Sequence, residues 1–214
     1  MRGFFRFLVW MLILAGVLMG LLWAVGFRIT RLPMNDPVFT VSLKPTLNEG
    51  DLVITQGISE PVYGDLVLCP EPGAEERYII GRIIGEPGDQ VVINNGKALV
   101  NGEGFRQEYN CNDSPFEYPH PNSDGEVVQQ ACGWEVIAGR THKTGYITKA
   151  GRREKRDFQV PEEHFFIFSD NRQFPYDSRD FGTAQIDSCR ATVIGRLWSK
   201  DGWFDSKNRL NYIR

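Results

Sequence analysis

The sequence has few of the residues that build metal sites or bind nucleic acid. It contains three histidines and four cysteines, and the cysteines show neither CxxC spacing nor histidines at the intervals of zinc ligands. Its 24 lysines and arginines are scattered, except for the Arg-Arg-Glu-Lys-Arg cluster at 152–156, which we interpret as a solvated hairpin or loop. Because the net charge is −3 and no longer basic block is present, we expect no nucleic-acid partner, no metal and no cofactor.

Amphipathic helical periodicity is also missing after the N-terminal segment. The chain instead has short runs rich in β-branched and aromatic residues, each bounded by Gly, Pro, Asp or Asn, at 52–55, 66–68, 90–93, 165–168 and 191–194. Asn95-Gly96 and Asn101-Gly102 flank one more short run, and Asn-Gly pairs accept the positive φ of tight hairpin turns. The sequence therefore predicts a mostly β protein.

One long apolar run is present, from Phe7 to Phe27. Its 21 residues carry no charge and have arginines on both sides, and a helix of this length covers about 30 Å of hydrocarbon. Trp10 and Trp23 lie near its ends, where such rings prefer the membrane interface. The small residues Ala24-Val-Gly26 would also suit cleavage of a secretory signal, but the run exceeds the roughly 7–15 residues of a signal core. We therefore predict a transmembrane helix over 7–27 within an anchor at 1–31.

Composition divides the remainder of the 214 residues. The strong β runs lie in 35–100 and 158–200, whereas 101–157 is polar, glycine-rich and carries two cysteines. We predict one β domain formed by 35–100 plus 158–200, an inserted β or irregular region at 101–157, and a tail at 201–214. A bridge between Cys111 and Cys132 would stabilise the insertion by about 3 kcal/mol, and the sequence leaves its existence open. Cys69 and Cys189 are expected to be small buried apolar residues.

Four sequence blocks follow the apolar run: Thr40-Val-Ser42-Leu-Lys-Pro45-Thr46-Leu47, Gly64-Asp65-Leu-Val67, Gly81-Arg82-Ile-Ile-Gly85-Glu-Pro87-Gly88-Asp89, and Asp170-Asn171-Arg172 with Asp177-Ser178-Arg179-Asp-Phe-Gly182. In this order and spacing they resemble the signature boxes of bacterial type I signal peptidases, which are membrane-tethered serine proteases. The resemblance implies a signal-peptidase-like β catalytic domain whose partners are the lipid bilayer and the signal peptides of exported precursors. It also implies a single-pass protein of the cytoplasmic (inner) membrane, with the catalytic body on the outer or periplasmic side.

Two residues of the first block match the family's reactive groups. Ser42 stands at the position of the nucleophile, and a serine hydroxyl needs a neighbouring base and an oxyanion hole to react. Thr40 stands where the family contributes a hydroxyl to that oxyanion hole. The alternative interpretations are that Ser42 lies in a turn before a strand and that the hydroxyl of Thr40 is hydrogen-bonded within a strand.

The third block departs from the family at its reactive position. The family's general base is a lysine immediately before the arginine, and this chain has Gly81 there. The serine whose hydroxyl supports that lysine is replaced by Pro175. Lys44 is a candidate substitute base, because residues i and i+2 of a strand share a face, which would place Lys44 on the same face as Ser42. His164 is another candidate in principle, since related enzymes of the endoplasmic reticulum use histidine, but its position favours a strand-entry residue.

The polar residues of the third and last blocks are predicted to support the site rather than to react. They are Arg82, Asp89, Asp170, Asn171, Arg172, Asp177, Ser178 and Arg179. Asp177 and Arg179 in particular are expected to form a buried or half-buried charge pair that holds the walls of the site.

The leading prediction is a membrane-bound serine endopeptidase that removes signal peptides, cleaving after small residues in an Ala-x-Ala pattern. The apolar segment around Phe39 and Val41 would pair as a strand with extended substrate. The alternative is a catalytically inactive homologue that binds leader peptides or a secretion partner, which Gly81 and Pro175 favour. A third interpretation is an envelope protein whose β body only scaffolds other proteins.

Overall fold

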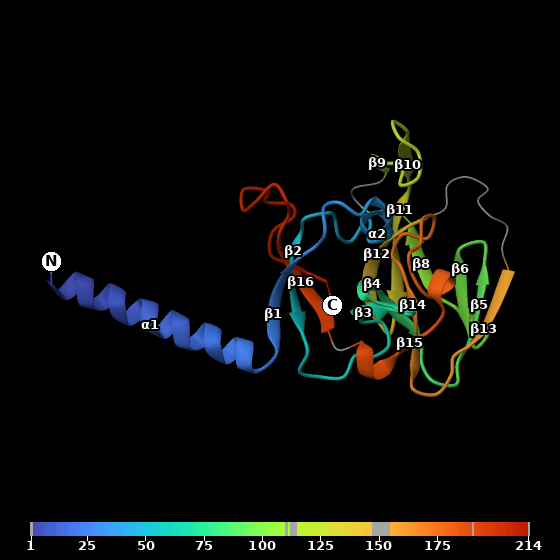
Figure 1. Cartoon of the computed structure of the whole chain (residues 1–214). Helices are drawn as coiled ribbons and strands as arrows, with labels where there is room; N and C mark the ends of the chain where they lie inside the picture. The colour runs from blue at the N-terminus through green and yellow to red at the C-terminus, as the bar shows by residue number, and fades with distance from the viewer. Residues whose placement is uncertain (1, 110, 112–114, 147–154, 190, 214) are drawn as a thin grey trace.

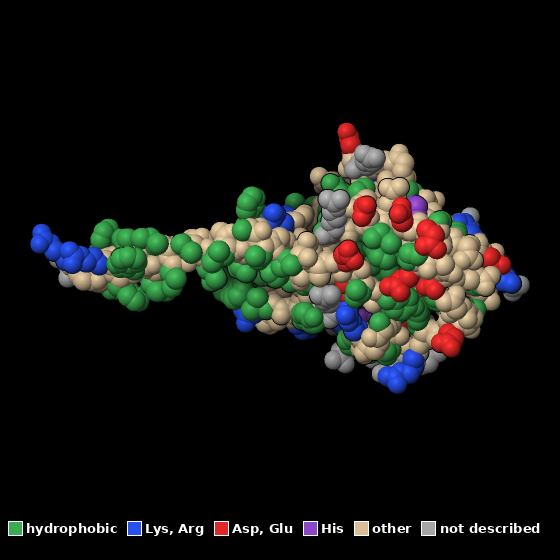
Figure 2. Space-filling view, turned by 90° about the horizontal axis from the view of Figure 1, so that it is seen from below, with side chains coloured by type: hydrophobic (Ala, Val, Ile, Leu, Met, Phe, Trp, Pro, Cys, Tyr) green, Lys and Arg blue, Asp and Glu red, His purple; other side chains and the backbone are tan. Residues whose placement is uncertain are grey.

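The computed structural model describes residues 2–109, 111, 115–146, 155–189 and 191–213, and it consists of a projecting N-terminal helix and a β body (Figure 1). The helix, α1 (Arg2–Ala24), buries none of its residues and has a mean hydropathy of 2.4, so it is long and apolar enough to cross a membrane. Hydrophobic side chains surround it and basic residues cover its outer end (Figure 2). It ends three residues before the predicted limit, because Gly26, at φ 86°, turns the chain into β1 (Phe27–Arg31).

The remaining elements are short, as the sequence predicts. They are α2 (Pro37–Ser42), β2 (Leu52–Gln56), β3 (Leu66–Glu71), β4 (Ala74–Gly85), β5 (Gln90–Asn94), β6 (Lys97–Val100), β7 (Glu103–Gly104), β8 (Arg106–Tyr109), β9 (Phe116–Pro119), β10 (Val127–Gln130), β11 (Cys132–Ile137), β12 (Arg140–Gly145), β13 (Lys155–Gln159), β14 (His164–Phe168), α3 (Ser178–Phe181), β15 (Ala184–Gln185), the 3-10 turn η1 (Ile186–Ser188), β16 (Ala191–Trp198) and β17 (Asn211–Tyr212). All five predicted β runs are strands, so the mostly β prediction is confirmed.

The main sheet has the strand order β1-β2-β16-β3-β4-β14-β15, with β17 also paired to β16. Side chains alternate between its two faces, which produces two apolar cores. On β14, Ile167 belongs to the core that contains Leu47 and Ile83, whereas Phe166 and Phe168 belong to the second core. Strands β4 and β14 therefore form the wall between the two cores, and the third and last sequence blocks lie on this wall or directly after it.

The second core is covered by a four-stranded sheet of order β13-β5-β6-β7. The turn between β5 and β6 has Asn95 at φ 50° and Gly96 at φ 76°, which confirms the predicted hairpin. Positive φ values at Asn101 and Gly102 confirm the second turn. Strand β13 follows the region 101–157 into the body and pairs antiparallel with β5, which lies between β13 and β6, the strand that precedes this region.

The described part of the region 101–157 is built of strands rather than irregular chain. It contains a two-stranded sheet, β10-β9, and a three-stranded sheet, β12-β11-β8. His142 lies in β12. Of the basic cluster at 152–156, Lys155 and Arg156 begin β13, and the first three residues lie outside the described residues.

The strand predicted around Phe39 and Val41 is wrong, because residues 37–42 form the short helix α2. Asp36 caps this helix by accepting a hydrogen bond from the Phe39 N–H at 3.0 Å, and Pro37 supplies a preset φ at its first position. Phe39 and Val41 are buried, so neither offers an open strand edge to a substrate.

All four cysteines are paired. Cys111 is bonded to Cys132, which the sequence left open, and Cys69 is bonded to Cys189 with a Cα–Cα distance of 4.3 Å. The expectation that Cys69 and Cys189 are separate apolar residues is therefore wrong. They meet because β3 pairs with β16, and Cys189 is the C-cap of η1, two residues before β16 begins.

Candidate active site

Ser42 is the last residue of α2, and its side chain is fully buried. Its Oγ donates a hydrogen bond to the Phe39 carbonyl oxygen at 2.6 Å, within the same helical turn. Thr40 is also buried, and its Oγ1 donates to the Asp36 carbonyl oxygen at 2.9 Å. Both predicted reactive hydroxyls thus lie in one helical turn and are engaged with its backbone.

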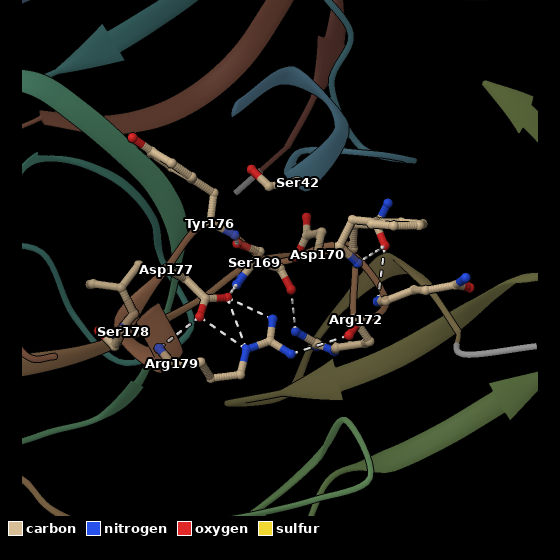
Figure 3. A network of polar contacts seen from close by, with 12 residues as sticks. Ser42, Ser169, Asp170, Arg172, Tyr176, Asp177, Ser178 and Arg179 are labelled. Carbon is tan, nitrogen blue, oxygen red and sulfur yellow. Dashed lines mark hydrogen bonds and ion pairs between the residues drawn. The ribbon is translucent and has the colours of Figure 1, made fainter. Parts of the chain in front are cut away.

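The last sequence block lies directly against this turn, since Ser42 and the loop after β14 face each other (Figure 3). The Asn171 backbone N–H donates to the Ser42 carbonyl oxygen at 3.0 Å, and the Asn171 Nδ2 donates to the Val41 carbonyl oxygen at 3.0 Å. The Asn171 Oδ1 accepts from Gln130 Nε2 and from the Gln173 N–H, each at 3.0 Å. Asn171 is buried, and these bonds fix the end of α2 to the loop.

A buried ion pair connects the third block to the last. Arg82 donates from Nε to Asp170 Oδ1 at 2.9 Å, and both side chains are almost fully enclosed. Asp170 also accepts a hydrogen bond from the hydroxyl of Thr46, four residues after Ser42. Burial alone raises the pKa of Asp170, but the adjacent Arg82 guanidinium outweighs it and lowers that pKa below its usual value. The carboxylate therefore stays charged and ties three separate segments together.

A second ion pair, Asp177 with Arg179, lies on the side of the loop away from Ser42 (Figure 3). Asp177 caps α3 and also accepts from the Ser169 N–H at 2.6 Å. Burial raises the pKa of Asp177, and the attached Arg179 guanidinium outweighs this and lowers it. Ser178 accepts from the Ile167 N–H at 2.8 Å, which fixes α3 against β14. These contacts hold the loop in shape and place no reactive group beside Ser42.

Asp89 has a separate role in the connection between β4 and β5. Its carboxylate accepts from the Glu86 N–H and from Asn101 Nδ2, each at 2.8 Å. It therefore fixes the turn at the end of the third block and the turn after β6 to each other.

Gly81 leaves no room for a side chain. It lies in β4 opposite Val67, and a Cβ built on it would be 2.7 Å from Ile167 Cγ2 and 3.0 Å from the Phe168 carbonyl carbon and oxygen. Real Cβ atoms essentially never approach another heavy atom as closely as the first of these distances. Strand β14 therefore occupies the place where a side chain of residue 81 would begin.

Comparison with known proteins shows the family to which this chain belongs. The model of the family described as signal peptidase, peptidase S26, matches residues 5–198. The chain belongs to this family. It is similar to signal peptidase I of Bacillus caldolyticus, with 27% identity over 73% of this chain and 75% of the relative. It is also similar to signal peptidase I of Aquifex aeolicus, with 27% identity over 67% of each chain, and to signal peptidase IB of Staphylococcus aureus, with 24% identity over 73% of each.

Within the signal peptidase family, the candidate substitute bases can now be placed. Lys44 follows α2, so the argument that put it on one face of a strand with Ser42 is wrong. Its Nζ donates to Asn48 Oδ1 at 2.8 Å. Burial lowers the pKa of Lys44, which is the ionisation change that a lysine base requires. His164 lies at the start of β14, as its strand-entry interpretation predicts, and its Nδ1 is 2.8 Å from the Glu162 carbonyl oxygen.

The sequence analysis missed one charged cluster beside the site, formed by Glu135 of β11 and His142 of β12. Arg172 donates to Glu135 Oε2, and His142 Nε2 lies 3.3 Å from the same oxygen. Burial raises the pKa of Glu135, but Arg172 and then His142 outweigh it and lower that pKa to about 2. Burial, and next the Arg82 charge, lowers the pKa of His142. The only signal for this cluster was a single acid between apolar neighbours in Gly133-Trp-Glu135-Val-Ile137.

Proposed function

We propose that this protein is a membrane-anchored serine endopeptidase that removes signal peptides from exported precursors. In this proposal α1 is the single membrane anchor, and the β body lies on the outer face of the cytoplasmic membrane. Three features support it: membership of the signal peptidase family, the apolar helix α1, and the network that joins the first, third and last sequence blocks. The observation that carries most weight is the double attachment of Asn171 to the carbonyl groups of Val41 and Ser42.

That attachment fixes the segment that contains Ser42. Neither the hydroxyl nor the N–H of Ser42 takes part in the contact with the loop. In the proposed reaction, Ser42 Oγ would attack the carbonyl carbon of the small residue before the cleaved bond, and its proton would pass to a base and then to the amine that leaves as this C–N bond breaks. Water would then hydrolyse the ester formed on Ser42 and release the cleaved signal peptide. The developing oxyanion would be held by the Ser42 N–H and the Thr40 hydroxyl, which generally contribute about 3–4 kcal/mol per donor. Because Ser42 is buried, substrate entry would require the last turn of α2 to open and break the bond from Ser42 to Phe39.

Lys44 is the base that we propose for this reaction. Its lowered pKa supports this role, and it would have to leave Asn48 and turn towards Ser42 when α2 opens. Arg82, Asp89, Asp170, Asn171, Arg172, Asp177, Ser178 and Arg179 are proposed to support the site. The contacts described above support that role for all of them except Asp89, whose carboxylate fixes two turns to each other.

A second candidate function is an inactive homologue that binds leader peptides without cutting them. The packing at Gly81 favours it, because Ile167 fills the place from which the family's lysine would extend. A lysine at residue 81 would require β14 to move, so the change of Gly81 to lysine is not expected to restore the family's chemistry by itself.

The test is a cleavage and binding assay on the full-length protein in detergent, with a fluorescently labelled precursor that has an Ala-x-Ala site. Ser42→Ala and Lys44→Gln are compared with Ser206→Ala, which changes an exposed serine of the C-terminal segment. Cleavage lost in Ser42→Ala and kept in Ser206→Ala would support the peptidase, and its loss in Lys44→Gln would support the base. Saturable binding without cleavage by the native chain would favour the inactive homologue. If the native chain neither cleaves nor binds the precursor, both candidate functions are contradicted.

A further inference from the structure

Tyr118 lies in β9 of the inserted region, and its side chain is buried. Its hydroxyl donates to Gln130 Oε1 at 2.6 Å, and Gln130 Nε2 donates to Asn171 Oδ1 at 3.0 Å. Asn171 Nδ2 in turn donates to the Tyr118 hydroxyl at 3.3 Å. The three side chains therefore form a closed cycle of hydrogen bonds, in which each donates to the next.

Neighbouring backbone groups fix the direction of this cycle. Asn171 Oδ1 also accepts from the N–H groups of Gln173 and Phe174, at 3.0 and 3.1 Å. Asn171 Nδ2 also donates to the Val41 carbonyl at 3.0 Å, so turning the amide over would set donors against donors and an acceptor against an acceptor. Burial raises the pKa of Tyr118 to about 12, so its hydroxyl keeps its proton and donates into the cycle.

The cycle is attached to the segment that contains the proposed nucleophile. The Asn171 side chain holds the Val41 carbonyl, and its backbone N–H holds the Ser42 carbonyl. Loss of the Tyr118 hydroxyl would leave a buried acceptor on Gln130 and a buried donor on Asn171 without this partner. Because buried polar groups that lose a partner are costly, this loss is expected to loosen Asn171 and the end of α2.

The aromatic ring of the same tyrosine faces Lys44. The Nζ of Lys44 is 6.0 Å from the centroid of the Tyr118 ring, a distance at which an aromatic face attracts a cation. Phe116 stacks on this ring with centroids 5.5 Å apart, and Phe174 packs perpendicular to it at 6.1 Å. These neighbours restrict the ring. An aromatic face favours the ammonium form, which Lys44 would take after accepting the proton of Ser42.

We propose that Tyr118 is a positioning residue of the active site: its hydroxyl holds the segment of Ser42 through Asn171, and its aromatic face holds Lys44. The inference rests on the proposed function, because only that reaction makes Ser42 and Lys44 the reacting groups. Tyr118 lies outside the four sequence blocks. The inserted region therefore completes the site.

Two variants separate the ring from the hydroxyl: Tyr118→Phe keeps the ring, and Tyr118→Leu removes both. The full-length protein in detergent is labelled with ¹³C at the lysine Cε, and the Lys44 signal is assigned with Lys44→Arg. Protons over an aromatic face shift upfield, so we expect an upfield Lys44 Hε signal in the native chain and in Tyr118→Phe. We expect that shift to be lost in Tyr118→Leu. An unchanged signal in Tyr118→Leu would overturn the contact with Lys44.

Hydrogen exchange at the backbone amides of residues 40–43 tests the hydroxyl. We expect it to be at least about fivefold faster in Tyr118→Phe, since a buried hydrogen bond is lost. Tyr78→Phe and Tyr78→Leu are the matched controls, because Tyr78 is an exposed tyrosine of β4, and both should keep the native signal of Lys44 and the native exchange. Native exchange in Tyr118→Phe would overturn the role of the hydroxyl.

Cleavage of a precursor with an Ala-x-Ala site distinguishes positioning from a loss of folded protein. We expect Tyr118→Phe to lower kcat at least about fivefold with KM nearly unchanged, and Tyr118→Leu to lower it at least about fivefold further. Native kcat in Tyr118→Phe, or equal kcat in the two variants, would overturn the proposal. If the native chain cleaves nothing, the proposed peptidase fails, and the Lys44 signal and the exchange at 40–43 still decide what Tyr118 positions.

Discussion

Ile167 of β14 packs against the backbone of Gly81 in β4, with its Cγ2 only 2.7 Å from the place that a Cβ of residue 81 would occupy. The two strands pair antiparallel, and Ile83 and Ile167 are directly opposite each other in the register. Gly81 is two residues before Ile83 and so faces the same core. The space beside residue 81 is therefore filled by the packing of this core, and the absence of a side chain there leaves no gap in the site.

We expect Gly81→Ala to destabilise the protein by about 1–2 kcal/mol. Overpacking of a filled core costs about 1–3 kcal/mol, which outweighs the 0.5–1 kcal/mol that alanine gains over glycine in a strand. Guanidinium unfolding followed by tryptophan fluorescence measures the change. Gly104→Ala is the control, because its Cβ would meet only Leu99 Cδ2, at 3.4 Å.

A double-mutant cycle identifies the cause of that loss. In the Ile167→Ala background, the Gly81→Ala change is expected to cost at least about 1 kcal/mol less, since the clashing Cγ2 is gone. Equal costs in both backgrounds would show that Ile167 is not what excludes a side chain at residue 81.

Asn171→Ala is expected to destabilise the body by about 1–3 kcal/mol, because the Val41 carbonyl and the Gln173 N–H lose their buried partner. The same variant should loosen the end of α2, so hydrogen exchange at the backbone amides of residues 40–43 is expected to accelerate. Asn122→Ala changes an exposed turn residue and should alter neither quantity. Unchanged exchange at 40–43 would contradict the role of Asn171 in fixing this helix.

The stability of the body should depend on Glu135 in acid. Its pKa falls from 4.5 in the unfolded chain to about 2 in the folded protein, so its contribution is fully present above about pH 4.5. That contribution is lost as the pH falls from there towards 2. We expect Glu135→Gln to make the free energy of unfolding less steeply dependent on pH in this window. Glu103→Gln, an exposed change in β7, should keep the native slope, and an equal slope in all three proteins would count against the prediction.

The two disulfides should differ in their contributions. Cys69–Cys189 closes 120 residues and Cys111–Cys132 closes 21, so the chain-entropy relation gives about 5 and about 3 kcal/mol. We expect the pair Cys69→Ala and Cys189→Ala to lower the free energy of unfolding more than the pair Cys111→Ala and Cys132→Ala. The reverse order would show that the long loop is already restrained in the unfolded chain.

The strands and hairpins could be predicted because their signals are local. Runs such as Phe165–Phe168 and the turn at Asn95-Gly96 carry their own periodicity and turn chemistry, and each forms where expected. The helix α2 also had a local signal, since Asp36 followed by Pro37 is a typical helix start. In the prediction, the β-branched residues that follow outweighed this signal. The helix forms nevertheless, because its six residues are enough for about one turn and a half.

Other features depend on contacts between distant segments and had no such signal. Cys69 meets Cys189 only because β3 and β16 become neighbours in the sheet. Likewise, Glu135 and His142 are paired with Arg172 and Asp170, which belong to the last sequence block. The sequence blocks predicted which residues belong together. The lack of room for a side chain at Gly81 could not be predicted without the position of Ile167.

The attachment of β12 to the last block limits how far this protein can be shortened. Gly145 donates its N–H to the Asp170 carbonyl at 2.9 Å and accepts from the Arg172 N–H at 3.0 Å, on either side of the residue that fixes Ser42. A miniaturised enzyme lacking 101–157 would keep every signature block and still lose the backbone partner that shapes the last one. Relatives with a reduced insertion would need a replacement strand at this place, which makes Gly145 a landmark for aligning them.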